Sequence, residues 1–220
     1  MNHTFYISGI NTDCGKTYIT GLLARNFLLK NYSVITQKPV QTGCTKNIAD
    51  DIRAHRHLME TELFPEDTNN TTCPYIFSYP ASPHFAAEID NKKISFSVLA
   101  ETREILQNTY SILLIEGAGG LCVPITKDVL FVDYLAEQSY PVILVCSSQL
   151  GSINHSILSL ELCKQKNIQV HGIVYNFLPD SDPNIAQNSF EYITTYASKH
   201  FPDTEILTSD ELEQGRIFSL

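Results

Sequence analysis

Several absences in this 220-residue sequence narrow what the chain can be. No run of about 18 apolar residues occurs, so we expect no membrane-spanning helix and no membrane partner. The six cysteines are scattered without a C-x-x-C pair, which argues against a zinc site and fits reduced thiols in a cytoplasmic protein. An apolar, β-rich run begins almost at the first residue, which leaves no room for a signal peptide.

Positive charge is also scarce. The sequence has 15 Lys and Arg against 24 Asp and Glu, a net charge of −9, which argues against broad nucleic-acid binding. A nucleotide would be repelled by the field of the whole chain, so its site would have to concentrate positive potential. One close charge pair is worth up to about 4 kcal/mol near a protein surface, so a few groups are sufficient.

The stretch from Thr4 to Thr20 reads TFYISGINTDCGKTYIT and is the most informative part of the sequence. It predicts a strand, a polar loop, then Gly15-Lys16-Thr17 at the start of a helix, which is the context of a phosphate-binding loop. Backbone N–H groups at a helix start lack partners and bind anions. Lys16 would reach the terminal phosphates, and the Thr17 hydroxyl would ligate Mg²⁺.

The glycine spacing departs from the common form of this loop. Five residues separate Gly9 from Gly15, whereas the usual pattern has four. The alternative is a chance Gly-Lys-Thr at a helix start. The preceding strand and its glycine favour the phosphate loop.

The next strand and helix add charged candidates. Residues 33–37 read as a strand that delivers Lys38 at its carboxyl end, where ligands lie in open α/β sheets. Lys38 is either a surface charge or a phosphate-site cation, and the position favours the second. Residues 47–60 read as a helix with Asp50 and Asp51 in its first turn. Either aspartate could ligate Mg²⁺ or only complement the helix dipole, and the spacing leaves both readings open.

A third strand ends in an acidic, glycine-rich turn. Residues 111–115 form an apolar run typical of a strand buried on both faces, and Glu116-Gly117-Ala118-Gly119-Gly120 follows. A carboxylate at this position favours metal binding, and the glycines allow close approach of the backbone to a ligand. Residues 61–91 are rich in Pro, Thr, Asn and aromatics, and we expect a long irregular stretch with a functional role.

The remaining pattern alternates strands and helices. We expect strands over 141–146, 170–175 and 205–207, and helices over 97–108, 132–139, about 150–166 and 185–200. Beyond this, residues 203–220 show little organisation. Such alternation predicts an α/β fold with a doubly wound, mostly parallel β-sheet flanked by helices. No repeat or linker is present, so residues 1–220 are expected to form a single domain.

Four motifs together resemble the dethiobiotin synthetase family over most of the chain. They are Gly9-x5-Gly15-Lys16-Thr17, Lys38-Pro39-Val40-x-Thr42-Gly43, Glu116-Gly117-Ala118-Gly119-Gly120 and Leu150-Gly151-x-Ile153-Asn154-His155. The resemblance implies a P-loop NTPase-like fold and a Mg²⁺- and ATP-dependent cyclo-ligase. In that reaction an amine of 7,8-diaminononanoate captures CO₂ as a carbamate, which attacks the γ-phosphate of ATP. The second amine then closes the ureido ring and expels phosphate.

The resemblance also implies roles for individual residues. The catalytic residues are Lys16, Lys38 and Thr12, and the metal ligands are Thr17, Asp51 and Glu116. The nucleotide site comprises Asp13, Cys14, Gly15, Lys16, Thr17, Tyr18, Glu116, Gly117, Ala118, Gly119 and Asn176. The substrate contacts are Thr42, Leu150, Gly151, Ser152 and Asn154, and the helix start from Gly151 to Asn154 would bind the substrate carboxylate across a homodimer interface.

One segment departs from the family. A Gly-x-Ile-Pro-like segment usually helps to hold the base, and here the region reads Thr204-Glu205-Ile206-Leu207-Thr208. We therefore expect weaker discrimination between nucleotide bases. Two alternative functions remain: a partition-type or metal-cluster-insertion ATPase, and a non-catalytic nucleotide-binding regulator. The first class resembles a pattern in which the phosphate loop has a second lysine near its start. This chain has Asn11 at that position.

Overall fold

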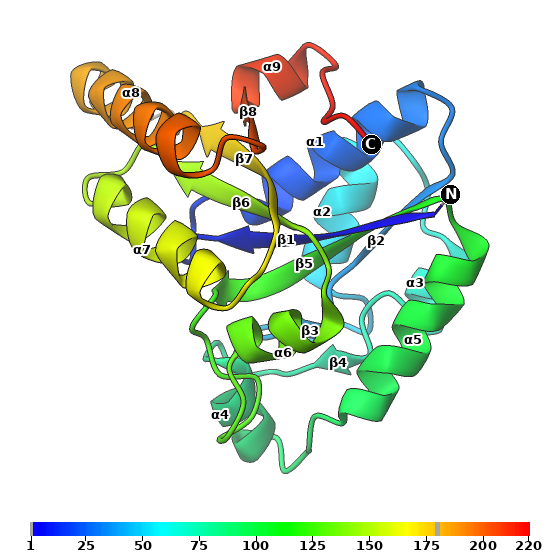
Figure 1. Cartoon of the computed structure of the whole chain (residues 1–220). Helices are drawn as coiled ribbons and strands as arrows, with labels where there is room; N and C mark the ends of the chain where they lie inside the picture. Colours follow the sequence, from blue (N-terminus) through cyan, green and yellow to red (C-terminus); the bar gives the residue numbers. More distant parts are fainter. Residues whose placement is uncertain (1, 179–180) are drawn as a thin grey trace.

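The computed structural model describes residues 2–178 and 181–220 and is built on a six-stranded sheet of order β2-β5-β1-β6-β7-β8 (Figure 1). Every neighbouring pair in this sheet runs parallel. A separate two-stranded sheet pairs β3 with β4, also in parallel. The predicted doubly wound α/β fold is thereby confirmed.

The strands are β1 (His3–Gly9), β2 (Val34–Gln37), β3 (Val40–Gln41), β4 (Tyr75–Ile76), β5 (Ile112–Gly120), β6 (Val142–Ser147), β7 (Val170–Asn176) and β8 (Glu205–Thr208). The helices are α1 (Lys16–Leu29), α2 (Asp50–Leu58), α3 (Pro65–Thr68), α4 (Pro83–Ile89), α5 (Phe96–Thr109), α6 (Phe131–Gln138), α7 (Ser152–Gln165), α8 (Pro183–His200) and α9 (Ser209–Glu213).

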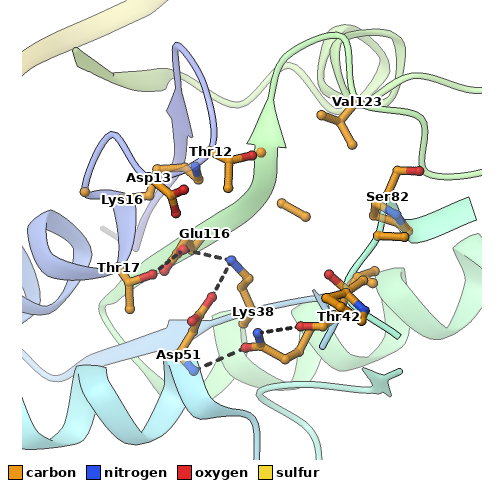
Figure 2. A pocket seen from close by; sticks show the side chains of 18 of the residues that line it. Thr12, Asp13, Lys16, Thr17, Lys38, Thr42, Asp51, Ser82, Glu116 and Val123 are labelled. Atoms are coloured by element: carbon orange, nitrogen blue, oxygen red, sulfur yellow. Dashed lines mark hydrogen bonds and ion pairs between the residues drawn. The ribbon is translucent and has the colours of Figure 1, made fainter. Parts of the chain in front are cut away.

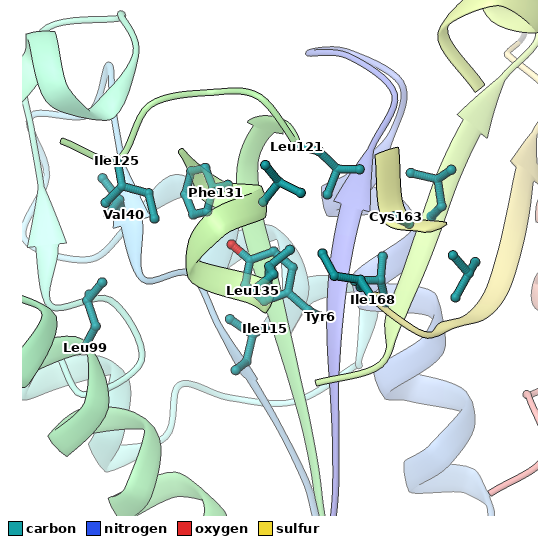
Figure 3. Close-up of a cluster of buried hydrophobic side chains, with 14 of the residues drawn as sticks. Tyr6, Val40, Leu99, Ile115, Leu121, Ile125, Phe131, Leu135, Cys163 and Ile168 are labelled. Carbon is teal, nitrogen blue, oxygen red and sulfur yellow. The ribbon is translucent and has the colours of Figure 1, made fainter. Parts of the chain in front are cut away.

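The central strands are mostly apolar because both faces of the sheet are covered. Side chains alternate between faces along a strand, so Tyr6 of β1 packs in one hydrophobic cluster, and Phe5 and Ile7 pack in another. The Tyr6 cluster includes buried residues of α5, α6, α7 and α8, and Figure 3 shows part of it. The Phe5 cluster includes residues of α1 and α9. Helices on both faces position the strand ends rigidly.

The strand order brings two predicted motifs together. β1 lies between β5 and β6, and its last residue, Gly9, pairs with Gly120 at the end of β5. The loop after β1 therefore starts beside the Glu116–Gly120 segment. Both motifs lie at the carboxyl edge of the sheet, where ligands bind in open α/β folds.

Two sequence expectations need correction. Residues 61–91 are not irregular throughout, because they contain α3, β4 and α4. The C-terminal region is also more organised than expected, since α9 follows β8. Thr208 and Glu211 form a capping box that starts α9, a local signal that outweighs the lack of apolar periodicity. None of the helices in the described parts of the chain has the length and hydropathy needed to cross a bilayer.

Candidate active site

The phosphate loop ends in a glycine that no other residue could replace without strain. Gly15 is the N-cap of α1 and has φ +96°, in the left-handed region that favours glycine. A Cβ atom here would lie 2.0 Å from Nδ2 of Asn176. This Nδ2 donates a hydrogen bond of 3.0 Å to the Cys14 carbonyl, so the end of β7 holds the loop in place.

Lys16 and Thr17 follow in the first turn of α1. Lys16 is buried, and its Nζ donates to the Asn11 carbonyl at 2.9 Å, so the side chain folds back over its own loop. Thr17 Oγ1 donates to Glu116 Oε1 at 2.9 Å. The predicted lysine, hydroxyl and carboxylate are therefore placed together by α1 and β5.

Lys38 joins two carboxylates from different elements (Figure 2). Its Nζ lies 2.6 Å from Asp51 Oδ2 and 2.8 Å from Glu116 Oε1, and it also donates to the Gly117 carbonyl at 3.1 Å. Lys38 follows β2, Asp51 lies in the first turn of α2, and Glu116 is part of β5. Lys38 and Glu116 are only 5% and 1% exposed.

The two aspartates that the sequence left open are separated by the structure. Asp51 lines the central cavity and contacts Lys38. Asp50 forms an ion pair of 2.7 Å with Lys46, and both side chains are solvent-exposed. Asp51 is thus the aspartate placed to act at the site.

Burial and charge act in opposite directions on this centre. Burial disfavours the ionised form of Glu116, but Lys38 and the hydrogen bond from His55 outweigh it and hold the Glu116 pKa well below its usual range. Burial likewise disfavours the Lys38 ammonium, but Glu116 and Asp51 outweigh it and raise the Lys38 pKa above its usual value. Both groups therefore stay charged through the neutral range.

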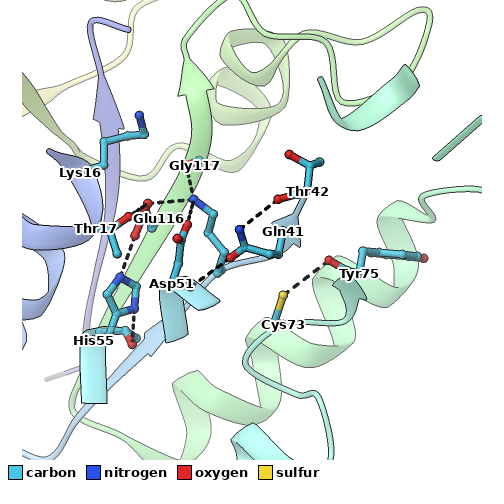
Figure 4. Close-up of polar contacts among 12 residues, drawn as sticks. Lys16, Thr17, Gln41, Thr42, Asp51, His55, Cys73, Tyr75, Glu116 and Gly117 are labelled. Atoms are coloured by element: carbon cyan, nitrogen blue, oxygen red, sulfur yellow. Dashed lines mark hydrogen bonds and ion pairs between the residues drawn. The ribbon is translucent and has the colours of Figure 1, made fainter. Parts of the chain in front are cut away.

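Sequence reasoning missed His55. Its Nε2 lies 2.7 Å from Glu116 Oε2, and its side chain is fully buried (Figure 4). His55 lies four residues after Asp51 in α2, so the two side chains share one face of the helix. That i, i+4 spacing from a candidate metal ligand is the signal that could have found it.

These groups surround an open cavity of about 820 Å³. The predicted residues that line it are Thr12, Asp13, Gly15, Lys16, Thr17, Tyr18, Lys38, Thr42, Asp51, Glu116, Ala118 and Gly119. Cys14, Gly117 and Asn176 do not line it but adjoin residues that do. Val40, from the Lys38–Gly43 motif, also lines it, and the wall is completed by residues with no individual role predicted from the sequence: Gln41, Pro80, Ala81, Ser82, Pro83 and Val123. Four of these come from the 61–91 stretch, which was expected to have a functional role.

The predicted carboxylate contacts lie elsewhere. Gly151 is the N-cap of α7, with φ +93°, and Leu150 before it is 86% exposed. Ser152 is buried and Asn154 is exposed. None of these four residues lines the central cavity of their own chain. Their role stays a prediction.

The donor set suits a hard cation better than zinc. Within residues 2–178 and 181–220, no group of three His, Cys, Asp or Glu side chains is arranged to hold a metal ion. Two carboxylates, Asp51 and Glu116, and the Thr17 hydroxyl offer oxygen donors beside the phosphate loop. Mg²⁺ is usually bound by one or two carboxylates together with phosphate oxygens and water, so these residues fit it.

Comparison with known proteins agrees with the motifs. A family model described as "AAA domain" matches residues 3–207. The chain is 46% identical to the ATP-dependent dethiobiotin synthetase BioD 2 of Haemophilus ducreyi, over 96% of this chain and 99% of the relative. It is 44% identical to the protein of the same name from Pasteurella multocida, over 93% and 95% of the two chains. This chain belongs to the ATP-dependent dethiobiotin synthetase family. The resemblance predicted from the four motifs is confirmed.

Solved structures support the fold. A ParA family ATPase from Chlorobium tepidum TLS superposes with a TM-score of 0.54, covering 98% of this chain and 89% of that chain at 14% identity. Identity this low shows a shared P-loop α/β fold alone. The likeness therefore does not support the partition-type alternative.

Proposed function

We propose that this chain is an ATP-dependent dethiobiotin synthetase, which forms dethiobiotin from 7,8-diaminononanoate, CO₂ and ATP. The single observation that carries this proposal is the meeting of Lys16, Lys38 and Glu116 around one open cavity, in a chain of this family. The cavity offers buried positive charge to an anionic reaction despite the net charge of −9.

The reaction needs charge stabilisation at each step. One substrate amine attacks the carbon of CO₂ and loses a proton to give a carbamate. A carbamate oxygen attacks the γ-phosphorus, and ADP leaves. The second amine attacks the carbonyl carbon and loses a proton, and phosphate leaves as the ring closes. Lys16 and Lys38 would neutralise the carbamate and the phosphoryl group, and the Thr12 hydroxyl would bind beside them.

We propose that Thr17, Asp51 and Glu116 hold Mg²⁺. The metal would neutralise charge on the ATP phosphates. Asp13 to Tyr18 and the Glu116–Gly119 segment at the end of β5 would bind the triphosphate, and Asn176 would lie beside the base. Thr42, on the opposite wall of the cavity, would contact the diamine.

We propose a homodimer in which α7 of one copy completes the site of the other. A helix N-terminus favours a carboxylate, and the α7 N-terminus does not line the cavity of its own chain. Leu150 and Leu158 are 86% and 61% exposed. Leu158 borders a hollow of about 320 Å³ formed with the Gly120–Val123 turn. An exposed apolar surface beside a hollow supports a second copy of the chain as its cover.

We propose that residues 1–220 act as one domain in the cytoplasm. The central sheet contains strands from His3 to Thr208, and Phe218 near the C-terminus is buried in the same core. The six cysteines are all free, including the exposed Cys122, which suits a reducing compartment.

The deciding experiment measures phosphate release as a function of diamine and CO₂. Release that requires both supports the proposal. ATP binding without such release would instead support the non-catalytic regulator, and diamine-independent hydrolysis would support another ATPase. Lys16→Ala should abolish release with an unchanged circular dichroism spectrum, because the lost ammonium group lies at the cavity wall and the hydrophobic clusters on both faces of the sheet stay intact. Retained turnover in this variant would refute the mechanism.

A further inference from the structure

A buried relay of hydrogen bonds runs from Thr36 through His55 and ends on Oε2 of Glu116. His55 Nε2 lies 2.7 Å from Glu116 Oε2, and His55 Nδ1 lies 3.0 Å from Thr36 Oγ1. Glu116 Oε1, the other oxygen, accepts from Thr17 and Lys38. The two oxygens of one carboxylate thus face different partners.

The relay fixes which ring nitrogen of His55 carries the hydrogen. Arg56 Nη1 can only donate, and it lies 2.8 Å from Thr36 Oγ1. The Thr36 oxygen accepts there and has a second lone pair, so this contact alone leaves both tautomers open; the ionised Glu116 carboxylate can only accept, which places a hydrogen on His55 Nε2. With its hydrogen on Nε2, the His55 ring can accept at Nδ1 the hydrogen of the Thr36 hydroxyl, 3.0 Å away.

Arg56 is itself held firmly. Its Nε and Nη2 each lie 2.8 Å from an oxygen of Asp67, a two-point contact with both side chains buried. Thr72 donates to Asp67 Oδ1 at 2.8 Å, and the Phe64 N–H donates to Oδ2 at 2.9 Å. The relay is therefore anchored to the segment around α3, away from the cavity.

We propose that His55 is a positioning residue for the nucleotide and metal site, which binds Glu116 Oε2 so that Oε1 is presented to the phosphate side. This inference rests on the proposed function of that site. Without the N–H of His55, the carboxylate could rotate about its Cγ–Cδ bond and lose its fixed orientation. Partners that orient a ligating carboxylate typically change metal affinity or activity by about 10–100-fold when removed.

The competing explanation is that His55 only fills the core between α2 and β5. A residue with that role would change the stability of the fold when replaced. It would leave the metal affinity of the folded protein unchanged. Metal affinity therefore separates the two explanations.

The experiment compares His55→Leu, which removes both ring nitrogens, with His55→Gln, whose amide can still donate to Glu116. His57→Leu is the matched control, because His57 is exposed on the same helix. Mn²⁺ serves as a paramagnetic probe, and its binding in the presence of a non-hydrolysable ATP analogue is followed by electron paramagnetic resonance. Nucleotide binding without metal is measured in parallel.

We expect His55→Leu to weaken Mn²⁺ binding by about 10-fold or more, with His55→Gln close to wild type and His57→Leu unchanged. Metal-free nucleotide binding should be the same in all four proteins. A folded His55→Leu protein with wild-type Mn²⁺ affinity would overturn the inference. The Mn²⁺-binding measurement needs no diamine or CO₂, so its outcome does not depend on whether the chain turns over the proposed substrates.

A second measurement covers the case in which His55→Leu does not fold. Nitrogen NMR of the histidine-labelled wild-type protein distinguishes the two neutral tautomers of the ring. We expect the Nε2–H form for His55, because the Glu116 carboxylate can only accept. The Nδ1–H form in the wild-type protein would overturn the relay.

Discussion

Asp50 and Asp51 are neighbours in sequence with different surroundings. Successive residues of an α-helix point about 100° apart, so only one of them can face the cavity. Asp51 contacts the buried Lys38, whereas Asp50 pairs with exposed Lys46. We therefore expect Asp51, and not Asp50, to contribute to metal binding.

We expect Asp51→Asn to raise the Mg²⁺ concentration for half-maximal turnover by about 10-fold or more, because a charge is lost from the metal and Lys38 site. Asp50→Asn should change it little, since exposed ion pairs contribute weakly. A Mg²⁺ titration of phosphate release checks both variants. Equal effects in the two variants would contradict the assignment of Asp51.

At the residue scale, the sequence predicted side chains that sit at strand ends and at one helix start. Lys16, Thr17, Lys38 and Glu116 could be grouped because parallel strands end at one edge of the sheet. The i, i+4 spacing of His55 from Asp51 places it on the same face of α2, but its contact with Glu116, 61 residues away, depends on how α2 is rotated. Rotation of a short helix follows from its packing, which the sequence pattern alone does not determine.

At the scale of elements, α2 and α3 are joined by a buried ion pair. Arg56 and Asp67 are 2% and 0% exposed at their side chains. We expect Asp67→Asn to lower the free energy of unfolding by about 3–5 kcal/mol, because the Arg56 charge is left uncompensated in the core. Asp133→Asn, which breaks the exposed pair with Lys166, is the control and should change stability little. Chemical denaturation measures both, and similar losses would contradict this view of the pair.

The junction of β8 and α9, at Thr208 and Ser209, lies beside the proposed base contact. Tyr175 pairs with Thr208, so this junction lies beside the end of β7 at Asn176. With no Gly or Pro in Thr204–Thr208, we expect kcat/KM for ATP to exceed that for GTP, CTP and UTP by no more than about 100-fold, since a partial pocket offers few specific hydrogen bonds. Steady-state rates with the four nucleotides test this. A preference for ATP of about 10⁴-fold would show a complete base pocket.

The long elements were predictable because each has a clear hydrophobic pattern. The strands of the central sheet are apolar runs, and α5 and α8 have apolar stripes. The four-residue α3 and the two-residue β4 have too few positions for such a pattern. Their formation depends on contacts with distant segments, such as the pairing of β4 with β3.

At the scale of the whole molecule, the net charge of the chain and the charge of the lysines at the cavity have opposite signs. The net charge of −9 repels nucleotides at long range, yet Lys16 and Lys38 are buried at the cavity. Solvent screens distant charges within about 10 Å at moderate salt, whereas buried groups are screened much less. The local charges therefore decide whether an anion binds, and the acidic surface affects mainly the rate of encounter.

The last prediction concerns the proposed dimer. Leu158→Glu places a charge in the exposed apolar surface beside the hollow and should convert a dimer into a monomer. If a partner's α7 supplies the carboxylate site, the KM for the diamine should rise by about 10–100-fold, because a hydrogen bond to a charged group contributes about 1.5–3 kcal/mol. Binding of ATP analogues should be retained, since Leu158 does not line the nucleotide cavity.

Leu29→Glu is the matched control for this prediction. Leu29 is 70% exposed at the end of α1 and lines neither the central cavity nor the hollow beside Leu158. A glutamate at this position should therefore leave assembly and KM unchanged. Analytical ultracentrifugation gives the oligomeric state, and steady-state kinetics gives the KM. A wild-type monomer with full activity would exclude an interface site. A monomeric Leu158→Glu protein with unchanged KM would mean that the carboxylate is bound within one chain, and the helix start of α7 would lose its proposed role.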